Sequence, residues 1–462
     1  MDNSNDKKMK KILLFIVFTS YGFSQGEINS LSIDDAIEYG IENNRNLVNA
    51  EREIKMAYKE RWKTIAIGLP NVTLDLNYLN YLELPTSLIP AEFFGGQKGE
   101  FSEIQFGTEQ TAIGAVRMEQ LLFDGSWLVG LEYSKIYLAA SENFYEKTFL
   151  EVRESIIKLY SLVVTLNEGI LLLENNLENF RKDLFEATEL YKNGFEEIEN
   201  VEQIKITLAQ AELSLLQANK TRENQTNLLK LILGINLEDN LILTTSINDF
   251  IADNIIFSNS FEDFNTDKNI DVKISQNIFD TKRIEYKLEK SKQLPKISGF
   301  LSGTYTGYNN DFDFTNKAQN WFGSSVLGVN LEIPIFNAFK LNVSSQKAKI
   351  AMNQAMTNLE EQEGKTQAKV QEKLNDYQLA IKTLNVSEQN MLLSVSIEEK
   401  NSIKFFEGIV SSFEFRQAQL QLLDSQQKYL NSVLELISIK TCLLYTSPSP
   451  RDLRKSRMPS SA

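Results

Sequence analysis

The chain has 462 residues, a formal net charge of −14 and no histidine. Without imidazole there is no Ser-His-Asp or Cys-His catalysis and no histidine metal site, and the acidic charge argues against nucleic acid as a partner. No Walker-type loop, GxGxxG or CxxC motif occurs, and the Glu-Glu pairs follow helical patterns typical of solvated faces. We therefore expect no enzyme, no cofactor and no metal.

Residues 1–24 have the pattern of a secretory signal peptide. Four lysines precede the apolar run Ile12–Phe18, and the small residues Gly22 and Ser24 follow it. This run is shorter than the roughly 20 residues that a membrane-spanning helix needs. The sequence thus predicts export rather than an N-terminal membrane anchor.

The rest of the chain carries one structural plan twice. Asn44–Val72 parallels Asn269–Ile297 at an offset of 225, and Val116–Gly125 parallels Val329–Ala338 at an offset of 213. Each half reads as a helix, a strand, a loop, a second strand, a long helix, a glycine turn and another helix. The first predicted repeat, 25–234, contains strands at 70–82 and 111–123 and a helical hairpin at 126–234. A linker or equatorial segment follows at 235–267. The second repeat, 268–440, contains strands at 296–308 and 324–336 and a helical hairpin at 339–440.

Residues 441–462 continue no pattern found upstream. They contain a basic segment rich in proline and serine that resembles translated sequencing-adapter sequence. We expect this tail to be non-native and the natural C-terminus to be missing; a genuine disordered tail is the alternative that the composition also permits.

The strand segments alternate apolar and polar residues. Val72, Leu74 and Leu76 are separated by polar residues, and Leu327, Val329 and Leu331 repeat the pattern. Alternation alone leaves two interpretations open: strands with lipid on one side and water on the other, or half-buried strands of a soluble sandwich. Four strands cannot close a barrel, so the membrane interpretation requires several chains. The segments 83–109 and 309–320 are then expected to be exposed loops.

The long helical segments carry a heptad pattern. Apolar residues from Val152 to Tyr191 recur at alternating steps of four and three, and Val370 to Leu384 repeat the pattern. This predicts helices that pack side by side through a narrow seam with polar surfaces elsewhere. Gly194 and Gly408 are predicted to end their helices as left-handed caps, so that each half forms a helical hairpin.

In this doubled order, residues of about 30–440 resemble the TolC-like outer-membrane efflux proteins. The resemblance rests on Leu31–Ala36, the two Leu-Pro strand starts, Ile333–Asn337 and the two glycine turns. It implies a mainly α fold with a membrane β portion: long coiled-coil hairpins forming a trimeric α-barrel, plus four strands per chain in a shared twelve-stranded β-barrel.

The family also implies function and partners. The homotrimer would be a passive exit duct in the outer membrane, with most of the chain in the periplasm, for a tripartite efflux pump or type I secretion system. Its partners would be a periplasmic adaptor protein, an inner-membrane transporter and outer-membrane lipid. The alternative from another class is a periplasmic adaptor or structural coiled-coil protein without a membrane barrel.

The resemblance implies a pore constriction just past the second glycine turn. Glu414 stands at the first acidic position of the family, Gln417 replaces the second, and Phe405 stands where a tyrosine often helps to close the entrance. The alternative for Glu414 is an ordinary solvated carboxylate.

Adaptor contact would fall on the hairpin tips. The alternative for the apolar tip residues is burial inside the closed end of the trimer itself. The residues concerned are Gly194, Phe195, Gly408, Ile409, Val410 and Ser411.

Overall fold

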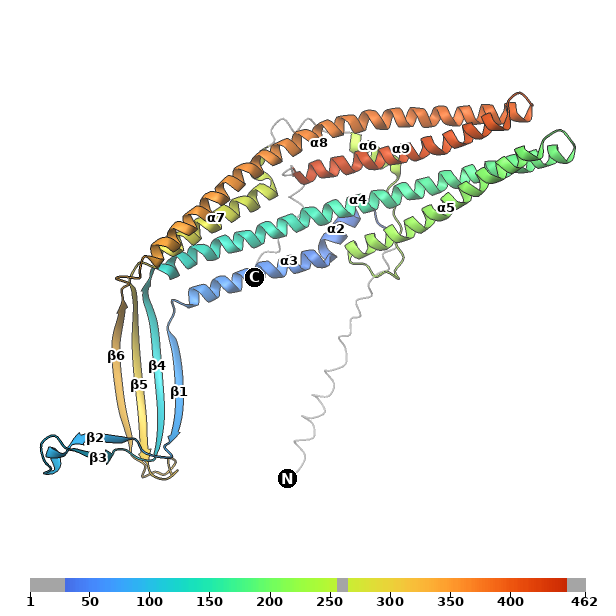
Figure 1. The fold of residues 1–462 in the computed structure, drawn as a ribbon. Helices are drawn as coiled ribbons and strands as arrows, with labels where there is room; N and C mark the ends of the chain where they lie inside the picture. The colour runs from blue at the N-terminus through green and yellow to red at the C-terminus, as the bar shows by residue number, and fades with distance from the viewer. Residues whose placement is uncertain (1–29, 256–264, 447–462) are drawn as a thin grey trace, which may run out of the picture. The chain divides into compact units, whose positions relative to one another are not determined.

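The computed structural model describes residues 30–255 and 265–446 (Figure 1). The predicted signal peptide at 1–24 lies outside the described residues. In chain order the elements are α2 (Ile33–Asn43), α3 (Arg45–Ala66), β1 (Asn71–Asn80), β2 (Thr86–Pro90), η1 (Ala91–Phe94), β3 (Phe101–Gln105), β4 (Gln110–Asp124), α4 (Gly125–Lys192), α5 (Ile198–Leu233), α6 (Ile247–Ile255), η2 (Thr266–Lys268), α7 (Ile270–Ser291), β5 (Lys296–Asn309), β6 (Trp321–Glu332), α8 (Lys340–Phe406) and α9 (Ser412–Thr446).

The described residues divide into two compact units. The helical unit contains residues 30–48, 148–255 and 369–446, and the sheet unit contains 49–147 and 265–368. The dividing points fall inside the long helices α4 and α8.

The internal duplication is visible at the start of α3 and of α7. The side-chain oxygen of Asn44 accepts hydrogen bonds from the backbone N–H groups of Asn46 (2.9 Å) and Leu47 (3.2 Å). Asn269, which is 225 positions further on, caps α7 in the same way. Both asparagines are buried, and each satisfies two N–H groups that have no partner within the first turn of the helix.

The main sheet is antiparallel, with strand order β1-β4-β5-β6 (Figure 1). The pairing brings Leu74 beside Val116 and Leu301 beside Leu327, so one face of the sheet is predominantly apolar. This face is uncovered within the chain, because Leu74 is 62% exposed and Leu327 is 81% exposed. A soluble sandwich would bury this face, and the structure therefore rules that interpretation out for the chain as folded.

The segment 83–109 is not a simple loop, contrary to our expectation. It forms a second sheet in which β2 and β3 pair from Thr86–Gln105 to Pro90–Phe101, and Figure 1 shows this hairpin projecting from the end of the main sheet. The prolines and glycines of the segment favour a loop. Gly95, Gly96 and Gly99 lie in the turn between the two strands, whereas Pro90 is the last residue of β2. Each strand is only five residues long, and strands this short give little alternation to detect.

Strand β6 is displaced from the predicted range 324–336. It begins at Trp321 and ends at Glu332, so the apolar residues 333–336 lie outside the sheet. Pro334 has no N–H to donate to a strand ladder, which explains the early end. The chain then turns through two residues with positive φ, Ala338 and Phe339, before α8 begins.

The heptad seam of α4 is confirmed in part. Its members Ile156, Val163, Leu177 and Phe180 are all less than 4% exposed, whereas Tyr191 at its end is 43% exposed. The expectation of a narrow seam is wrong, however, because a second stripe beside it is also buried. That stripe consists of Tyr160, Ser161, Val164, Thr165, Asn176 and Asp183.

The wider buried arc has a physical cause, since α4 packs between two neighbours. On one side Arg181 forms an ion pair with Glu212 of α5 at 2.9 Å. On the other side Asn176 donates a hydrogen bond to Gln426 of α9 at 2.6 Å. A helix with a neighbour on each flank must bury more than one stripe.

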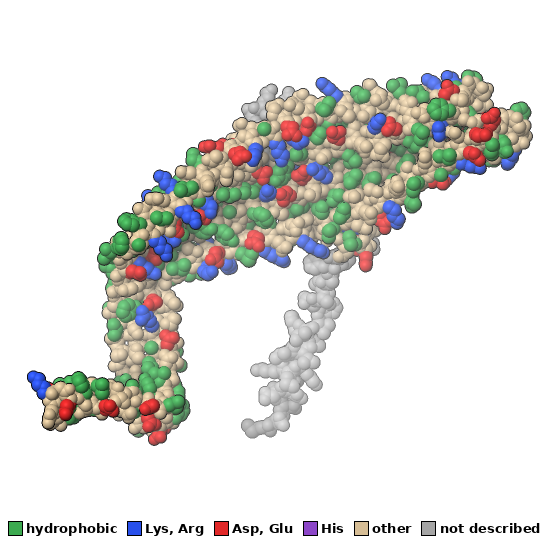
Figure 2. All heavy atoms as spheres, viewed as in Figure 1, with side chains coloured by type: hydrophobic (Ala, Val, Ile, Leu, Met, Phe, Trp, Pro, Cys, Tyr) green, Lys and Arg blue, Asp and Glu red, His purple; other side chains and the backbone are tan. Residues whose placement is uncertain are grey.

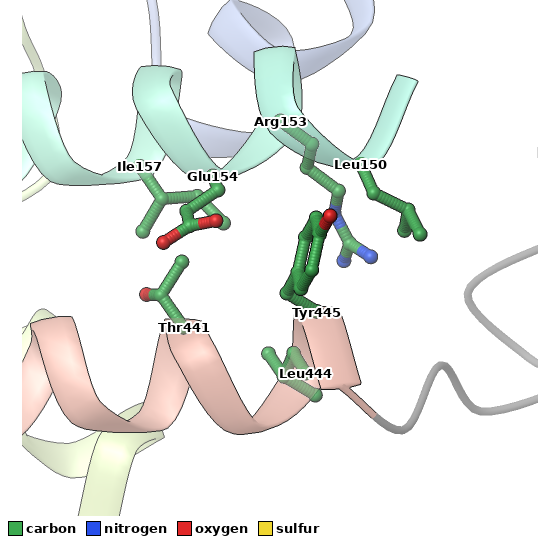
Figure 3. A pocket seen from close by; sticks show the side chains of 7 residues that line it. All are labelled: Leu150, Arg153, Glu154, Ile157, Thr441, Leu444 and Tyr445. Carbon is green, nitrogen blue, oxygen red and sulfur yellow. The ribbon is translucent and has the colours of Figure 1, made fainter. Parts of the chain in front are cut away.

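Helix α9 continues through Thr446, past position 441 where the non-native tail was predicted to begin. Leu443 is fully buried, and Figure 3 shows Thr441 and Tyr445 facing α4. The space between them and Arg153 is about 10 Å³, which is enough for one water molecule. This end of α9 therefore packs on α4 without forming a ligand site.

Candidate functional site

Both helical hairpins end in the same turn geometry, as predicted. Gly194 has φ +76° and Gly408 has φ +72°, in the left-handed region that favours glycine. At the second tip, Gly408 N–H donates to the carbonyl of Phe405 (2.9 Å) and Ile409 N–H donates to that of Lys404 (2.8 Å). The first tip has the equivalent pair of bonds. The glycine caps are thus confirmed as Schellman motifs.

An apolar cluster lies directly behind the second tip. Phe405 of α8 stacks on Phe415 of α9 with ring centroids 5.1 Å apart. Ala187 of α4 and Val201 and Ile204 of α5 complete the buried core of this cluster, which we call the tip cluster. The four long helices are therefore joined where the hairpins turn.

Glu414 lies in the first turn of α9, where it closes a capping box. Its carboxylate accepts hydrogen bonds from Ser411 N–H (2.9 Å) and Ser411 Oγ (3.1 Å), while Ser411 Oγ accepts from Glu414 N–H (3.3 Å). These bonds hold the pKa of Glu414 below its usual value, so the exposed side chain stays charged in mildly acidic solution.

The structure brings only part of the predicted constriction together. Glu414 and Gln417 are both exposed on α9, one turn apart. Phe405 is instead buried in the tip cluster, where it contacts Phe406 and Phe415. In the single chain its role is packing.

The predicted adaptor-contact residues differ in exposure. Phe195 is 80% exposed at the first tip and Ile409 is 65% exposed at the second. Ser411 is also exposed, whereas Val410 packs partly against the tip cluster. Within a single chain, each tip therefore presents uncovered apolar side chains, and Phe195 and Ile409 are the most exposed of them.

A buried polar pair in the seam between α4 and α9 was not predicted. Gln419 Nε2 donates a hydrogen bond to Asp183 Oδ2 at 3.0 Å, and both side chains are buried. Burial, followed by the nearby charge of Glu398 on α8, raises the pKa of Asp183 to about 7. Asp183 stands one residue before a seam position, so the sequence pattern assigns it to the polar surface.

On the face shown in Figure 2, charged side chains along the helices are mixed in sign rather than gathered in one patch. Among residues 30–255 and 265–446, no group of histidine, cysteine, aspartate and glutamate side chains is arranged to hold a metal ion. The tips and the apolar sheet face are thus the features with the clearest functional meaning.

Comparison with known proteins agrees with this geometry. The family model described as "Outer membrane efflux protein" matches residues 269–438. No curated protein matches the chain.

Several solved structures share the fold. The outer membrane protein VceC from Vibrio cholerae has a TM-score of 0.70 and 15% identity, covering 90% of this chain and 95% of its own. The CmeC outer membrane channel of Campylobacter jejuni has a TM-score of 0.69 and 15% identity, with coverage of 92% and 88%. The open state of the MtrE outer membrane channel of Neisseria gonorrhoeae has a TM-score of 0.67 and 12% identity, with coverage of 90% and 88%. Residues 269–438 are thus similar to the outer membrane efflux protein family, and the chain as a whole shares its fold with these solved outer-membrane channels.

Proposed function

We propose that three copies of this chain form a passive exit duct through the outer membrane, serving a tripartite efflux pump or a type I secretion system. The observation that carries the proposal is the four-stranded sheet with one uncovered apolar face. Within residues 30–255 and 265–446, β1 pairs with β4 alone and β6 pairs with β5 alone, so both edges of this sheet are open to other copies. Lipid cannot satisfy open strand edges, and closure by neighbouring chains removes them.

The outer helices of the helical unit support assembly with further copies. Helix α8 exposes Leu379, Val386 and Leu393 at spacings of seven, and α5 exposes Ile206 and Leu213 at the same spacing. These stripes lie apart from the seam that joins the helices of one chain. A heptad stripe without a partner is the pattern of a coiled-coil interface, and α5 of one copy would pack against α8 of the next.

The adaptor alternative fits less well. An adaptor without a membrane barrel would cover its apolar strands with a second layer, whereas Val72, Leu327 and Val329 are all more than 60% exposed. The long hairpins are common to both classes, and the uncovered sheet favours the duct.

Single-channel recording of protein extracted from outer membranes tests the duct, and the variant Glu414→Gln tests its constriction. We expect discrete, long-lived conductance steps that prefer cations, and a smaller cation preference in Glu414→Gln. Glutamine can retain the capping box with Ser411, so the change removes charge while leaving the turn intact. The readout is the reversal potential across a salt gradient.

Glu199→Gln is the matched control, because Glu199 is the exposed carboxylate in the first turn of α5 after the first tip. If both variants keep the original ion selectivity, Glu414 does not line the constriction. If folded protein yields no conductance at all, the duct itself is wrong.

The tips are the surface that we assign to the periplasmic adaptor. We expect a cysteine at Ser411, in a Cys442→Ser background that removes the single cysteine of the sequence, to cross-link to a polypeptide other than this chain. A cysteine at Thr357, which is exposed on α8 outside the tips, should not do so. Products containing only copies of this chain would instead place Ser411 inside the closed end of the trimer.

A further inference from the structure

The apolar face of the main sheet contains a preformed pocket of about 330 Å³ near the connections that follow β1 and β5. This volume lies at the lower end of the range for small-molecule sites. Tyr78, Ala112, Gly114, Tyr305 and Trp321 contribute from four strands, and Phe312 and Phe314 come from the β5–β6 connection.

The strand register explains why the sheet is hollow here. Tyr78, Ala112, Gly307 and Trp321 lie in one cross-strand row, so large and small residues meet on the same face. A Cβ atom at Gly307 would lie 3.2 Å from the Trp321 ring, so this ring packs directly against the glycine. The small residues between the aromatic rings leave the floor of the pocket open.

The neighbouring row repeats the arrangement. It contains Leu76, Gly114, Tyr305 and Gly323, and a Cβ atom at Gly323 would lie 3.2 Å from the Tyr305 ring. At Gly114, by contrast, a Cβ atom would meet only the Leu76 side chain at an ordinary 3.4 Å. A side chain at Gly114 would therefore enter the pocket without forcing the backbone to move.

Two phenylalanines of the β5–β6 connection form the rim of the pocket. Phe312 and Phe314 pack edge-on against Tyr78, with ring centroids 5.3 and 6.1 Å away, and Phe314 lies 6.2 Å from Trp321. Phe312 is still 72% exposed, so in water most of its ring surface would stay hydrated and the arrangement would bring little stabilisation. If hydrocarbon covers the two rings, their apolar surface is removed from water, which is favourable.

We propose that this pocket binds one acyl chain of an outer-membrane lipid, and that Phe312 and Phe314 pack on the side of the acyl chain that faces away from the sheet. The inference rests on the proposed membrane duct, because the pocket is continuous with the apolar face that lipid would cover. None of the residues that line it carries a charged side chain, so its chemistry suits hydrocarbon rather than a lipid headgroup. The pocket would hold one lipid per chain at the rim of the barrel.

Gly114→Leu should fill the pocket, and Gly303→Leu is the matched control. Gly303 lies on the same face in the adjacent row, opposite Val116, and a Cβ atom there would meet nothing within 4 Å. Each protein is purified in mild detergent, incubated with dioleoyl phosphatidylethanolamine, and examined by native mass spectrometry, which reports oligomeric mass and retained lipid together. We expect the unmodified protein and Gly303→Leu to retain about one lipid per chain, and Gly114→Leu to bind it at least tenfold more weakly.

Phe312→Ser with Phe314→Ser removes the rim without touching a strand, and we expect it to weaken retention as well. Equal retention in all four proteins would overturn the acyl-chain site. A third outcome is that the trimers retain no lipid and that Gly114→Leu, but not Gly303→Leu, destabilises them. This would mean that a neighbouring copy, rather than lipid, fills the pocket. Absence of any trimer from folded protein would contradict the proposed duct rather than the pocket.

Discussion

Replacing Phe415 with alanine is expected to lower the free energy of unfolding of the helical unit by about 3–5 kcal/mol. The ring is 1% exposed and stacks on Phe405 at 5.1 Å, inside a cluster that joins α4, α5, α8 and α9. Alanine would leave a cavity that the four helices cannot all close. Because the cluster lies behind the tips, we also expect the second hairpin to open locally, with faster amide hydrogen exchange around Gly408.

Phe413→Ala provides the matched control two residues earlier on the same helix. Phe413 is 60% exposed, and the guanidinium carbon of Arg416 lies over its ring, 5.7 Å from the centroid. Loss of such an exposed contact costs about 0.5–1 kcal/mol. Urea unfolding followed by circular dichroism compares the two variants. Equal destabilisation would show that the tip cluster does not hold the hairpins together.

The helices and the duplication could be predicted because their signals are local. The steps of four and three along α4 identify the side chains that must be buried, and Ile156 and Phe180 are indeed buried. The second buried stripe could not be predicted in this way, because it exists only where α4 meets α5 and α9. Asn176 and Gln426 form a hydrogen bond across 250 positions of sequence, and no periodicity within one helix contains that pairing.

The candidate site shows the same division. The glycine turns were predicted because a residue that favours positive φ follows each long apolar repeat. The capping box was also present in the sequence, since Ser411 precedes Glu414 by three positions, but the interpretation of Glu414 followed the family's pore instead. The burial of Phe405 depends on contacts with three other helices, and its position in the sequence gives no sign of them.

Asp183 makes the stability of the helical unit depend on pH. Its carboxylate faces Glu398 from α8 and Gln419 from α9, with Glu186 and Lys182 on its own helix, and its pKa rises from 3.8 to about 7 chiefly through burial. The folded chain therefore binds more protons than the unfolded chain between these two values. The free energy of unfolding consequently falls as pH rises from about 4 to 7. Above that window the folded chain bears the full free-energy cost of keeping the buried Asp183 carboxylate ionised.

The variant Asp183→Asn removes this cost while its side-chain oxygen can still accept the hydrogen bond from Gln419. Each pKa unit corresponds to about 1.4 kcal/mol, so at pH 8 we expect the variant to be more stable than the unmodified chain by about 2–4 kcal/mol, and below pH 4 by almost nothing. Urea unfolding across this pH range measures the difference, with Glu178→Gln, an exposed carboxylate on the same helix, as the control that should leave the pH profile unchanged. A variant that is less stable at pH 8 would mean that the charged form of Asp183 is held by contacts stronger than its burial cost, such as those across a trimer interface. The buried carboxylate would then belong to the assembly rather than to the single chain.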